Sequence, residues 1–156
     1  MREIERKFLI LSLPDGLESH PASEIRQGYL AVAEDREVRL RARNGRFFLT
    51  VKQGRGLSRE EAEVELEEPQ FEKLWPLTHG RRVEKTRYEL VQGDVTIELD
   101  VFQGTLSSLC LAEVEFSSNQ EALAFRPPDW FGEEVTENER FKNKSLALHG
   151  RPEGGL

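Results

Sequence analysis

The stretch EVRLRARNGRFFLTVK, residues 37–52, points most directly to the architecture of this chain. Charged or polar residues alternate with apolar ones on both sides of the pair Asn44-Gly45, so that Arg39 and Arg41 share one face of an extended segment. Asn-Gly is typical of tight hairpins, because both residues adopt positive φ readily. The two halves of the stretch are therefore predicted to form an antiparallel hairpin with cations along one face.

The same alternation returns in further segments, namely residues 3–10, 61–67, 83–90, 95–101 and 111–116. An ordinary half-buried sheet explains such alternation without any function, but it predicts mixed signs on the polar face. Here like charges are grouped by segment: acidic at Glu3 and Glu5, basic at Arg39 and Arg41, acidic at Glu63 and Glu65, basic at Lys85 and Arg87, acidic at Glu98 and Asp100, and acidic at Glu113 and Glu115. The predicted fold is α+β, a closed antiparallel barrel of about eight strands in which these pairs converge on a polar interior.

The segment Glu3-Ile4-Glu5-Arg6-Lys7 combines carboxylates and an ammonium at alternate positions. In a strand the side chains of Glu3, Glu5 and Lys7 project together, which suits a divalent cation beside an anion such as phosphate. The alternative interpretation is a charged amino-terminal strand with a solvated face, because short motifs match by chance.

These residues resemble the CYTH superfamily, also called triphosphate tunnel metalloenzymes, whose E-x-E-x-K motif is matched by residues 3–7. Further blocks resemble those of the family in the same order: Gln27-Gly28-Tyr29-Leu30, Val38-Arg39-Leu40-Arg41, Leu49-Thr50-Val51-Lys52, Glu63-Val64-Glu65, Lys85-Thr86-Arg87, Ile97-Glu98-Leu99-Asp100, Glu113-Val114-Glu115 and Asn143-Lys144-Ser145-Leu146-Ala147. The resemblance covers about residues 1–148 and implies a tunnel domain that binds a triphosphate with a metal.

Carboxylates without clustered His or Cys favour Mg²⁺ or Mn²⁺ over zinc or copper. The predicted metal ligands are Glu3, Glu5, Glu113 and Glu115, with Asp100 as a further ligand or an outer group. The predicted phosphate contacts are Lys7, Arg39, Arg41, Lys52, Lys85 and Arg87. Either Lys142 or Lys144 resembles the carboxy-terminal phosphate contact of the family. Glu63, Glu65 and Glu98 are supporting acidic residues, which orient the cations or add metal ligands.

Tyr29 and Lys7 are the candidate catalytic residues. The resemblance implies that Tyr29 accepts a proton, as the tyrosine of this block does in hydrolase members. An unperturbed phenol titrates near pH ~10, however, so Tyr29 could equally position the substrate.

The predicted reaction is metal-dependent hydrolysis of inorganic triphosphate to pyrophosphate and phosphate. Class IV adenylate cyclase and thiamine triphosphatase remain alternatives, because they would use the same cations and metal. A polyphosphate-binding module without activity is the alternative from a different class, although so many carboxylates would hinder plain anion binding.

Composition agrees with one charged domain. The chain has 156 residues, of which 33% are charged and 37% hydrophobic, and its net charge is −7. A single tunnel domain is predicted over residues 1–148, followed by a flexible tail at 149–156. The negative charge argues against nucleic acid as a partner. A small triphosphate is the expected partner of a monomer or homodimer.

No apolar stretch is long enough for a membrane span and no signal peptide is apparent, so a cytoplasmic location without membrane binding is expected. Three helices are predicted to pack outside the barrel. They cover residues 69–75, residues 119–125 with Asn119 as the N-cap, and a segment that starts near Asn138 and runs towards Gly150.

Overall fold

A computed structural model describes residues 4–54 and 60–152, which form an antiparallel sheet with short helices. The strands are β1 (Ile4–Ile10), β2 (Ala22–Ala33), β3 (Arg36–Arg43), β4 (Arg46–Gln53), β5 (Glu60–Leu66), β6 (Arg82–Gln92), β7 (Val95–Phe102), β8 (Cys110–Phe116) and β9 (Phe131–Glu134). The α-helices are α1 (Glu68–Leu74), α2 (Asn119–Ala124) and α3 (Asn143–His149), and the 3-10 turns are η1 (Leu17–Ser19), η3 (Trp75–Thr78), η4 (Gly104–Leu106) and η5 (Glu139–Phe141). None of these described helices is long and apolar enough to cross a membrane.

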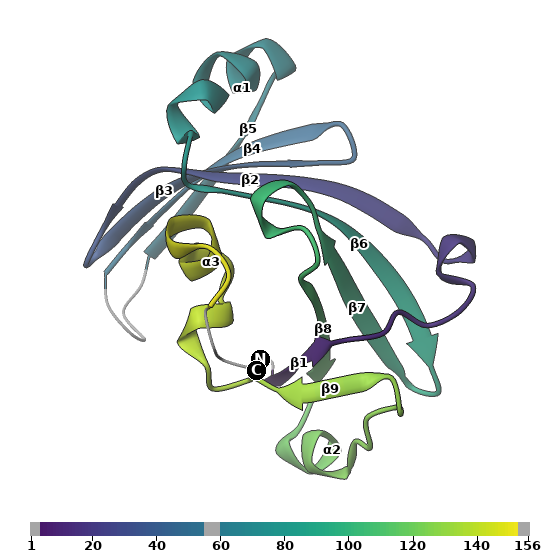
Figure 1. Cartoon of the computed structure of the whole chain (residues 1–156). Coiled ribbons are helices and arrows are strands. Elements are labelled where there is room, and N and C mark those ends of the chain that lie inside the picture. Colours follow the sequence, from purple (N-terminus) through teal and green to yellow (C-terminus); the bar gives the residue numbers. More distant parts are fainter. Residues whose placement is uncertain (1–3, 55–59, 153–156) are drawn as a thin grey trace.

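The strands form one sheet in the order β5-β4-β3-β2-β6-β7-β8-β1-β9. The predicted hairpin is confirmed: β3 pairs with β4 up to Arg43 and Arg46, and Asn44 and Gly45 both have positive φ, at 50° and 78°. The sheet curves so strongly that its strands wrap around α3 (Figure 1). No pairing between the edge strands β5 and β9 is found in the described residues. The sheet has nine strands, against about eight predicted.

Residues that pair directly across an antiparallel ladder lie on the same face of the sheet, which identifies a continuous charged face. Lys7 pairs with Glu113, which pairs with Glu98. Asp100 pairs with Arg87. We call this surface the charged face; β2 joins its two halves through the ladders with β3 and β6. It carries Glu5, Lys7, Arg39, Arg41, Thr50, Lys52, Glu63, Lys85, Arg87, Glu98, Asp100, Glu113 and Glu115.

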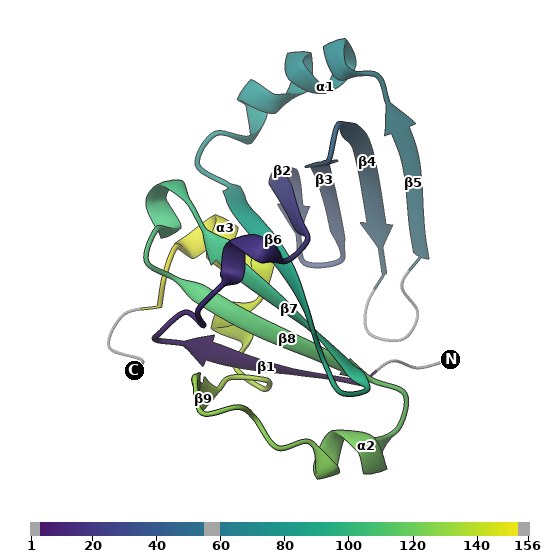
Figure 2. The ribbon, with the colours of Figure 1, turned by 90° about the vertical axis from the view of Figure 1, so that its right-hand side faces the viewer.

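Helices α1 and α2 cover the opposite, apolar face, as predicted (Figure 2). Phe71 of α1 is fully buried in a cluster with Leu40 and Phe47. Ala122 of α2 packs with Phe116 in a second cluster. Burial of such side chains typically contributes ~1.5–3 kcal/mol each, so this outer layer holds the curved sheet in place.

Helix α3 departs from the prediction, because it packs at one end of the charged face rather than outside. Leu9, Phe102 and Leu111 share that face by alternation with Lys7, Asp100 and Glu113, and they form one apolar cluster with Phe141 and Leu146. The inward face is thus charged over most of its length and apolar where α3 covers it. Sequence alternation could not reveal this, because an apolar residue at an inward position looks like an irregularity in the pattern.

Two local predictions about the helices were also wrong. Ser118, not Asn119, caps α2, since its side chain accepts a hydrogen bond from the backbone N–H of Glu121. The segment expected to run as one helix from Asn138 is broken: Asn138 caps η5, and extended backbone at Lys142 separates η5 from α3. The predicted tail starts at residue 149, whereas in the structure His149 is the last residue of α3.

Candidate functional site

Three carboxylates meet where β1 and β8 lie side by side. Each of Glu5, Glu113 and Glu115 offers an oxygen, and these oxygens lie within 4.8 Å of one another. A hydrogen bond with Glu113, burial and the negative charge of Glu113 and Glu115 raise the pKa of Glu5 to about 8. A proton or a divalent cation relieves such crowding, so the group fits a metal that prefers oxygen ligands. Glu3, the fourth predicted ligand, lies outside the described residues.

Asp100 lies among cations rather than in this carboxylate group. Its Oδ1 accepts from Arg87 Nε at 2.8 Å, and its Oδ2 accepts from Arg87 Nη2 at 3.1 Å and from Lys85 Nζ at 2.8 Å. Burial raises the pKa of Asp100, but the charges of Lys85 and Arg87 outweigh burial and lower it overall. Both carboxylate oxygens are therefore engaged within the sheet.

The two cations that hold Asp100 differ in their access to a ligand. Lys85 is only 2% exposed, and its Nζ has a second acceptor in Asn143 Oδ1 at 3.3 Å. Burial lowers the pKa of Lys85. Arg87 also donates through Nη1 to Glu98 at 3.1 Å. Burial lowers the pKa of Arg87, but Asp100 and Glu98 raise it overall, so both predicted phosphate contacts already have anionic partners.

Arg39 and Arg41 of β3 are in a different condition. The Nε atoms of both residues are buried, and neither has a hydrogen-bond partner among the described residues. Burial and the nearby positive charges of Arg87, Arg39 and Arg43 lower the pKa of Arg41. A buried donor without an acceptor is unfavourable, and a cation among cations adds to that cost. An anion beside these two Nε atoms would supply the missing acceptors.

The predicted lysine contacts are dispersed. Lys7 donates from Nζ to the carbonyl of Phe141 at 3.2 Å, and Lys52 pairs in the ladder with Glu37 on β3. Lys142 and Lys144 lie at the start of α3, where Lys142 contacts Glu139 at 2.9 Å and Lys144 contacts the buried Glu37 at 3.7 Å. Lys144 is thus connected to the charged face, because its partner Glu37 pairs with Lys52 across the β3–β4 ladder. Lys142 contacts only the nearby Glu139 among the ion pairs of the described residues.

The supporting acidic residues differ in their hydrogen-bond partners. Glu63 accepts a hydrogen bond from Thr50, which is 1% exposed, at 3.0 Å. Glu65 instead pairs with Arg46 near the solvent, with distances of 2.8 and 3.2 Å, and Arg46 lowers its pKa. Glu98 contacts Arg87, a predicted phosphate contact, at 3.1 Å.

Tyr29 is 2% exposed and lies opposite Arg39 in the β2–β3 ladder. Its hydroxyl accepts a hydrogen bond from Gln27 Nε2 at 3.0 Å. Burial raises the pKa of Tyr29, and the negative charge of Glu37 acts in the same direction, whereas Gln27 and Arg39 oppose them. The phenol is therefore neutral at ordinary pH, which favours a hydroxyl that donates or positions over a phenolate base.

Two cavities border the charged face and have opposite charge. A cavity of about 360 Å³ is lined by Arg41, Arg43, Asn44, Arg46, Phe48 and Glu63. One of about 440 Å³ is lined by Glu89, Asp94, Val95, Thr96, Glu98 and Glu115. Arg43 and Glu89 meet at 3.4 Å between them. The β3–β4 side can thus hold anions and the β7–β8 side cations.

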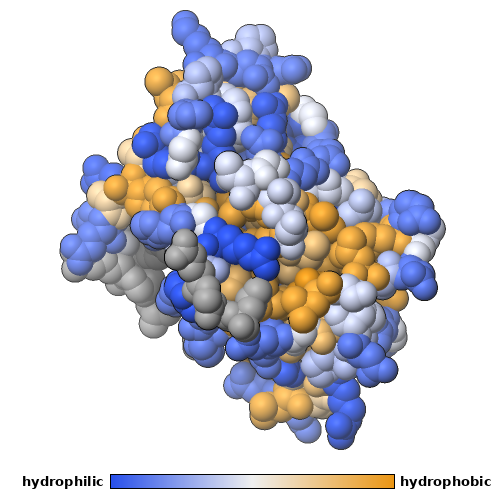
Figure 3. Space-filling view, in the orientation of Figure 1, coloured by the Kyte–Doolittle hydropathy of each residue, from blue (hydrophilic) through white to orange (hydrophobic). Residues whose placement is uncertain are grey.

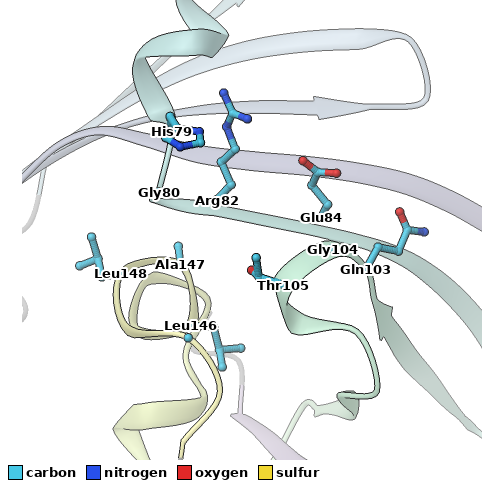
Figure 4. A pocket seen from close by; sticks show the side chains of 11 residues that line it. His79, Gly80, Arg82, Glu84, Gln103, Gly104, Thr105, Leu146, Ala147 and Leu148 are labelled. Atoms are coloured by element: carbon cyan, nitrogen blue, oxygen red, sulfur yellow. The ribbon is translucent and has the colours of Figure 1, made fainter.

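A third cavity, of about 410 Å³, lies where α3 meets β6 and η4 (Figure 4). Leu146 and Ala147 face it from α3, whereas Arg82 and Glu84 extend from β6 away from α3. Among the described residues that line it, none was predicted to bind metal or phosphate. In the view of Figure 3, apolar surface forms a band across the middle of the molecule, with hydrophilic surface above and below it. The chemistry of the charged face does not extend to this cavity.

Gln27, Glu37 and Asn143 contact predicted site residues but are not among the residues predicted from the sequence. Gln27 and Glu37 lie on the charged face, and their alternation with neighbours could have revealed them. Asn143 reaches Lys85 from α3 across 58 positions of sequence, and no local pattern signals that contact.

With this geometry described, comparison with known proteins identifies the class: the chain belongs to the CYTH domain family, which matches residues 1–149. A curated inorganic triphosphatase of Nitrosomonas europaea is 57% identical over 151 residues, which cover 95% of this chain and 98% of that protein. A curated inorganic triphosphatase of Acetivibrio thermocellus is 35% identical and covers 93% of this chain and 92% of its own length. A crystal structure of an inorganic triphosphatase superposes with a TM-score of 0.84 at 51% identity, over 95% of both chains.

Proposed function

We propose that this chain is a metal-dependent hydrolase that cleaves inorganic triphosphate into pyrophosphate and phosphate. The observation that carries the proposal is the presence, on one face, of a crowded carboxylate group together with Arg39 and Arg41, whose buried Nε atoms lack acceptors among the described residues. The activity of relatives with 57% and 35% identity over nearly the whole chain supports it.

Glu5, Glu113 and Glu115 would hold Mg²⁺ or Mn²⁺, with Glu3 as a further ligand. The donor set fits, because it consists of carboxylate oxygens so close that a hydrogen bond with Glu113, burial and the negative charge of Glu113 raise the pKa of Glu5. When bound, the metal supplies charge neutralisation on the phosphates and activation of water. Asp100 would serve this site indirectly, since Arg87 and Lys85 occupy its oxygens.

Arg39, Arg41 and Arg87 would bind the phosphate oxygens, because guanidinium donors match these oxygens in bidentate fashion. Lys7 and Lys52 would add point charges, with Lys144 favoured over Lys142 for the contact from α3. Lys85 would act mainly by holding Asp100 and Arg87 in place, since it is buried with two acceptors. Glu63 and Glu98 would orient the surrounding polar groups, through Thr50 and Arg87 respectively.

In the reaction, a water oxygen forms a bond to a terminal phosphorus while the anhydride P–O bond breaks, and pyrophosphate leaves with the electron pair. The transition state is loose, so positioning and neutralisation matter more than a strong base. Lys7 lies on β1 with Glu5 and pairs with Glu113 of β8. It would neutralise charge on the transferred phosphoryl group. Tyr29, whose raised pKa keeps it neutral, would orient a phosphate oxygen or the attacking water by its hydroxyl.

A product assay tests the proposal. Purified protein is incubated with tripolyphosphate, ATP or thiamine triphosphate, each with Mg²⁺, with Mn²⁺ or with EDTA, and all products are quantified. The expected result is fast release of phosphate from tripolyphosphate only when metal is present. Cyclic nucleotide or thiamine diphosphate as the faster product would assign a different reaction, and binding of tripolyphosphate without turnover would indicate a binding module.

We further propose a cytoplasmic monomer or homodimer that binds neither nucleic acid nor membrane. The net charge of −7 supports the first exclusion. Light scattering during gel filtration would measure the oligomeric state, and cell fractionation would measure the location.

A further inference from the structure

One residue, Arg81, holds the backbone on both sides of Tyr29. The N–H of Tyr29 donates to the carbonyl of Arg81 at 3.0 Å. In return, Nε of Arg81 donates to the carbonyl of Tyr29 at 2.9 Å. Because both peptide groups that flank the Tyr29 Cα are fixed by the same residue, the direction in which its side chain leaves the backbone is fixed as well.

The side chain of Arg81 replaces hydrogen bonds that the sheet cannot make here. The β2–β6 ladder ends at the pair Gly28 and Arg82, and β2 bulges between Tyr29 and Ala31. Carbonyl groups at such a point need other donors, since buried backbone polar groups are nearly always paired. The Arg81 guanidinium donates to the carbonyls of Leu30 at 3.4 Å and Leu77 at 3.0 Å, as well as to that of Tyr29. Hydrogen bonds from a charged donor are stronger than neutral ones.

The residue before Tyr29 adds a second restraint. A Cβ atom at Gly28 would lie 2.7 Å from the side chain of Thr78, which is fully buried. Turn η3, which ends at Thr78, therefore presses directly on the strand beside Tyr29. Arg81 ties the same turn through the Leu77 carbonyl, so the close approach and the guanidinium bonds act on one short piece of backbone.

We propose that Arg81 is a positioning residue for triphosphate hydrolysis, which acts by aiming the hydroxyl of Tyr29 along the charged face. Its guanidinium is occupied by three main-chain carbonyls, so it acts through the backbone and not on the substrate. A small rotation at the Tyr29 backbone displaces the far end of the ring most, and a displacement of about 1 Å can cost ~100-fold in rate. The inference rests on the proposed function, because it requires Tyr29 to act on the triphosphate.

A double-mutant cycle tests the inference. The variants are Arg81→Met, Tyr29→Phe and the double variant, assayed for kcat and KM with tripolyphosphate and Mg²⁺. Arg81→Met is expected to lower kcat about tenfold or more with KM changed less than about threefold. In the Tyr29→Phe background the same substitution is expected to change kcat less than about twofold, because the group that it positions is already absent. A purely structural role would lower kcat by the same factor in both backgrounds.

Arg26→Met is the matched control. Arg26 supports α1 and η3 from the outer face, through an ion pair with Glu72 at 2.8 Å and contacts with the rings of Phe71 and Trp75. Its loss is expected to lower Tm while kcat at a temperature where all variants are folded stays within about twofold of wild type. If Arg81→Met does not fold, Arg81→Lys, which keeps the charge and part of the hydrogen bonding, carries the same cycle.

Wild-type kcat in the folded Arg81 variant, or equal losses in both backgrounds, would overturn the inference alone. Wild-type kcat in Tyr29→Phe would overturn the proposed role of Tyr29 and with it the inference. Absence of tripolyphosphate hydrolysis in the wild-type protein would instead refute the proposed function. The three failures are therefore distinguishable.

Discussion

Two pairs of cations on the charged face have opposite surroundings. On β6, Lys85 and Arg87 are joined to Asp100 by contacts of 2.8 to 3.1 Å, and Arg87 also reaches Glu98. On β3, Arg39 and Arg41 have buried Nε atoms without acceptors in the part of the chain that the structure describes. The first pair has carboxylate partners within the fold, whereas the second pair keeps buried donors that an anion could satisfy. Cations of the same sequence pattern can therefore differ in how much of their hydrogen bonding the fold itself supplies.

The largest expected effect comes from removing the carboxylate that Lys85 and Arg87 share. Asp100→Ala leaves the buried ammonium of Lys85 and the guanidinium of Arg87 without their partner, and breaking a buried ion pair from one side typically costs ~3–5 kcal/mol. Urea unfolding of the purified variant is the measurement. Asp100→Asn, which keeps the shape and some of the hydrogen bonding, is the control and should lose less. A loss under about 1 kcal/mol in Asp100→Ala would show that this network does not stabilise the fold.

For Arg39 and Arg41 we expect the opposite outcome, a loss of activity without a loss of stability. Arg41→Met should lower kcat/KM for tripolyphosphate by about ten- to a hundredfold or more, because a lost charged hydrogen bond costs ~1.5–3 kcal/mol. Stability without ligand should not fall, because Arg41 lies near the positive charges of Arg87, Arg39 and Arg43 and its buried Nε has no acceptor among the described residues. Kinetics and Tm are recorded on the same preparation. A lower Tm together with wild-type kinetics would reverse the assignment of the two pairs.

A smaller effect is expected from pH in the metal-free protein. The folded-state pKa of Glu5 is raised to about 8 from an ordinary value of 4.5, so the folded protein binds more protons than the unfolded chain between these values. Stability should therefore fall as pH rises through this window. Because Glu5 is solvent-exposed, screening keeps the change modest. Thermal unfolding in EDTA from pH 5 to 8 measures it.

Glu5→Gln, which mimics the protonated carboxyl, should flatten this dependence. Added Mg²⁺ should weaken or reverse it in the wild type, since the metal requires ionised ligands. An unchanged slope in Glu5→Gln would show that other groups cause the dependence.

The sequence predicted most of the strands and the sharing of one face by the charges, because alternation and the Asn44-Gly45 turn are local signals. It did not predict which cations have partners. Asp100 was expected as a further metal ligand or as an outer group, and residue spacing alone could not reveal that the β6–β7 register places it opposite Arg87. Likewise, Leu146 packs against the apolar end of the inward face through contacts distant in sequence. Pairing and packing across the sheet depend on tertiary geometry, which residue spacing along one segment does not contain.

The smallest effect is expected at the edge of the sheet. Glu65 and Arg46 form an ion pair whose side chains are 50% and 66% exposed, and such pairs contribute little. Glu65→Gln should leave Tm unchanged within error and kcat/KM within about twofold of wild type. Glu63→Gln, two residues away on the same face of β5, should lower kcat/KM further, because Glu63 accepts from the buried Thr50 on the charged face. If Glu65→Gln instead lowered kcat/KM tenfold or more, Glu65 would contribute to the phosphate site, and its ion pair with Arg46 would no longer mark it as a structural charge.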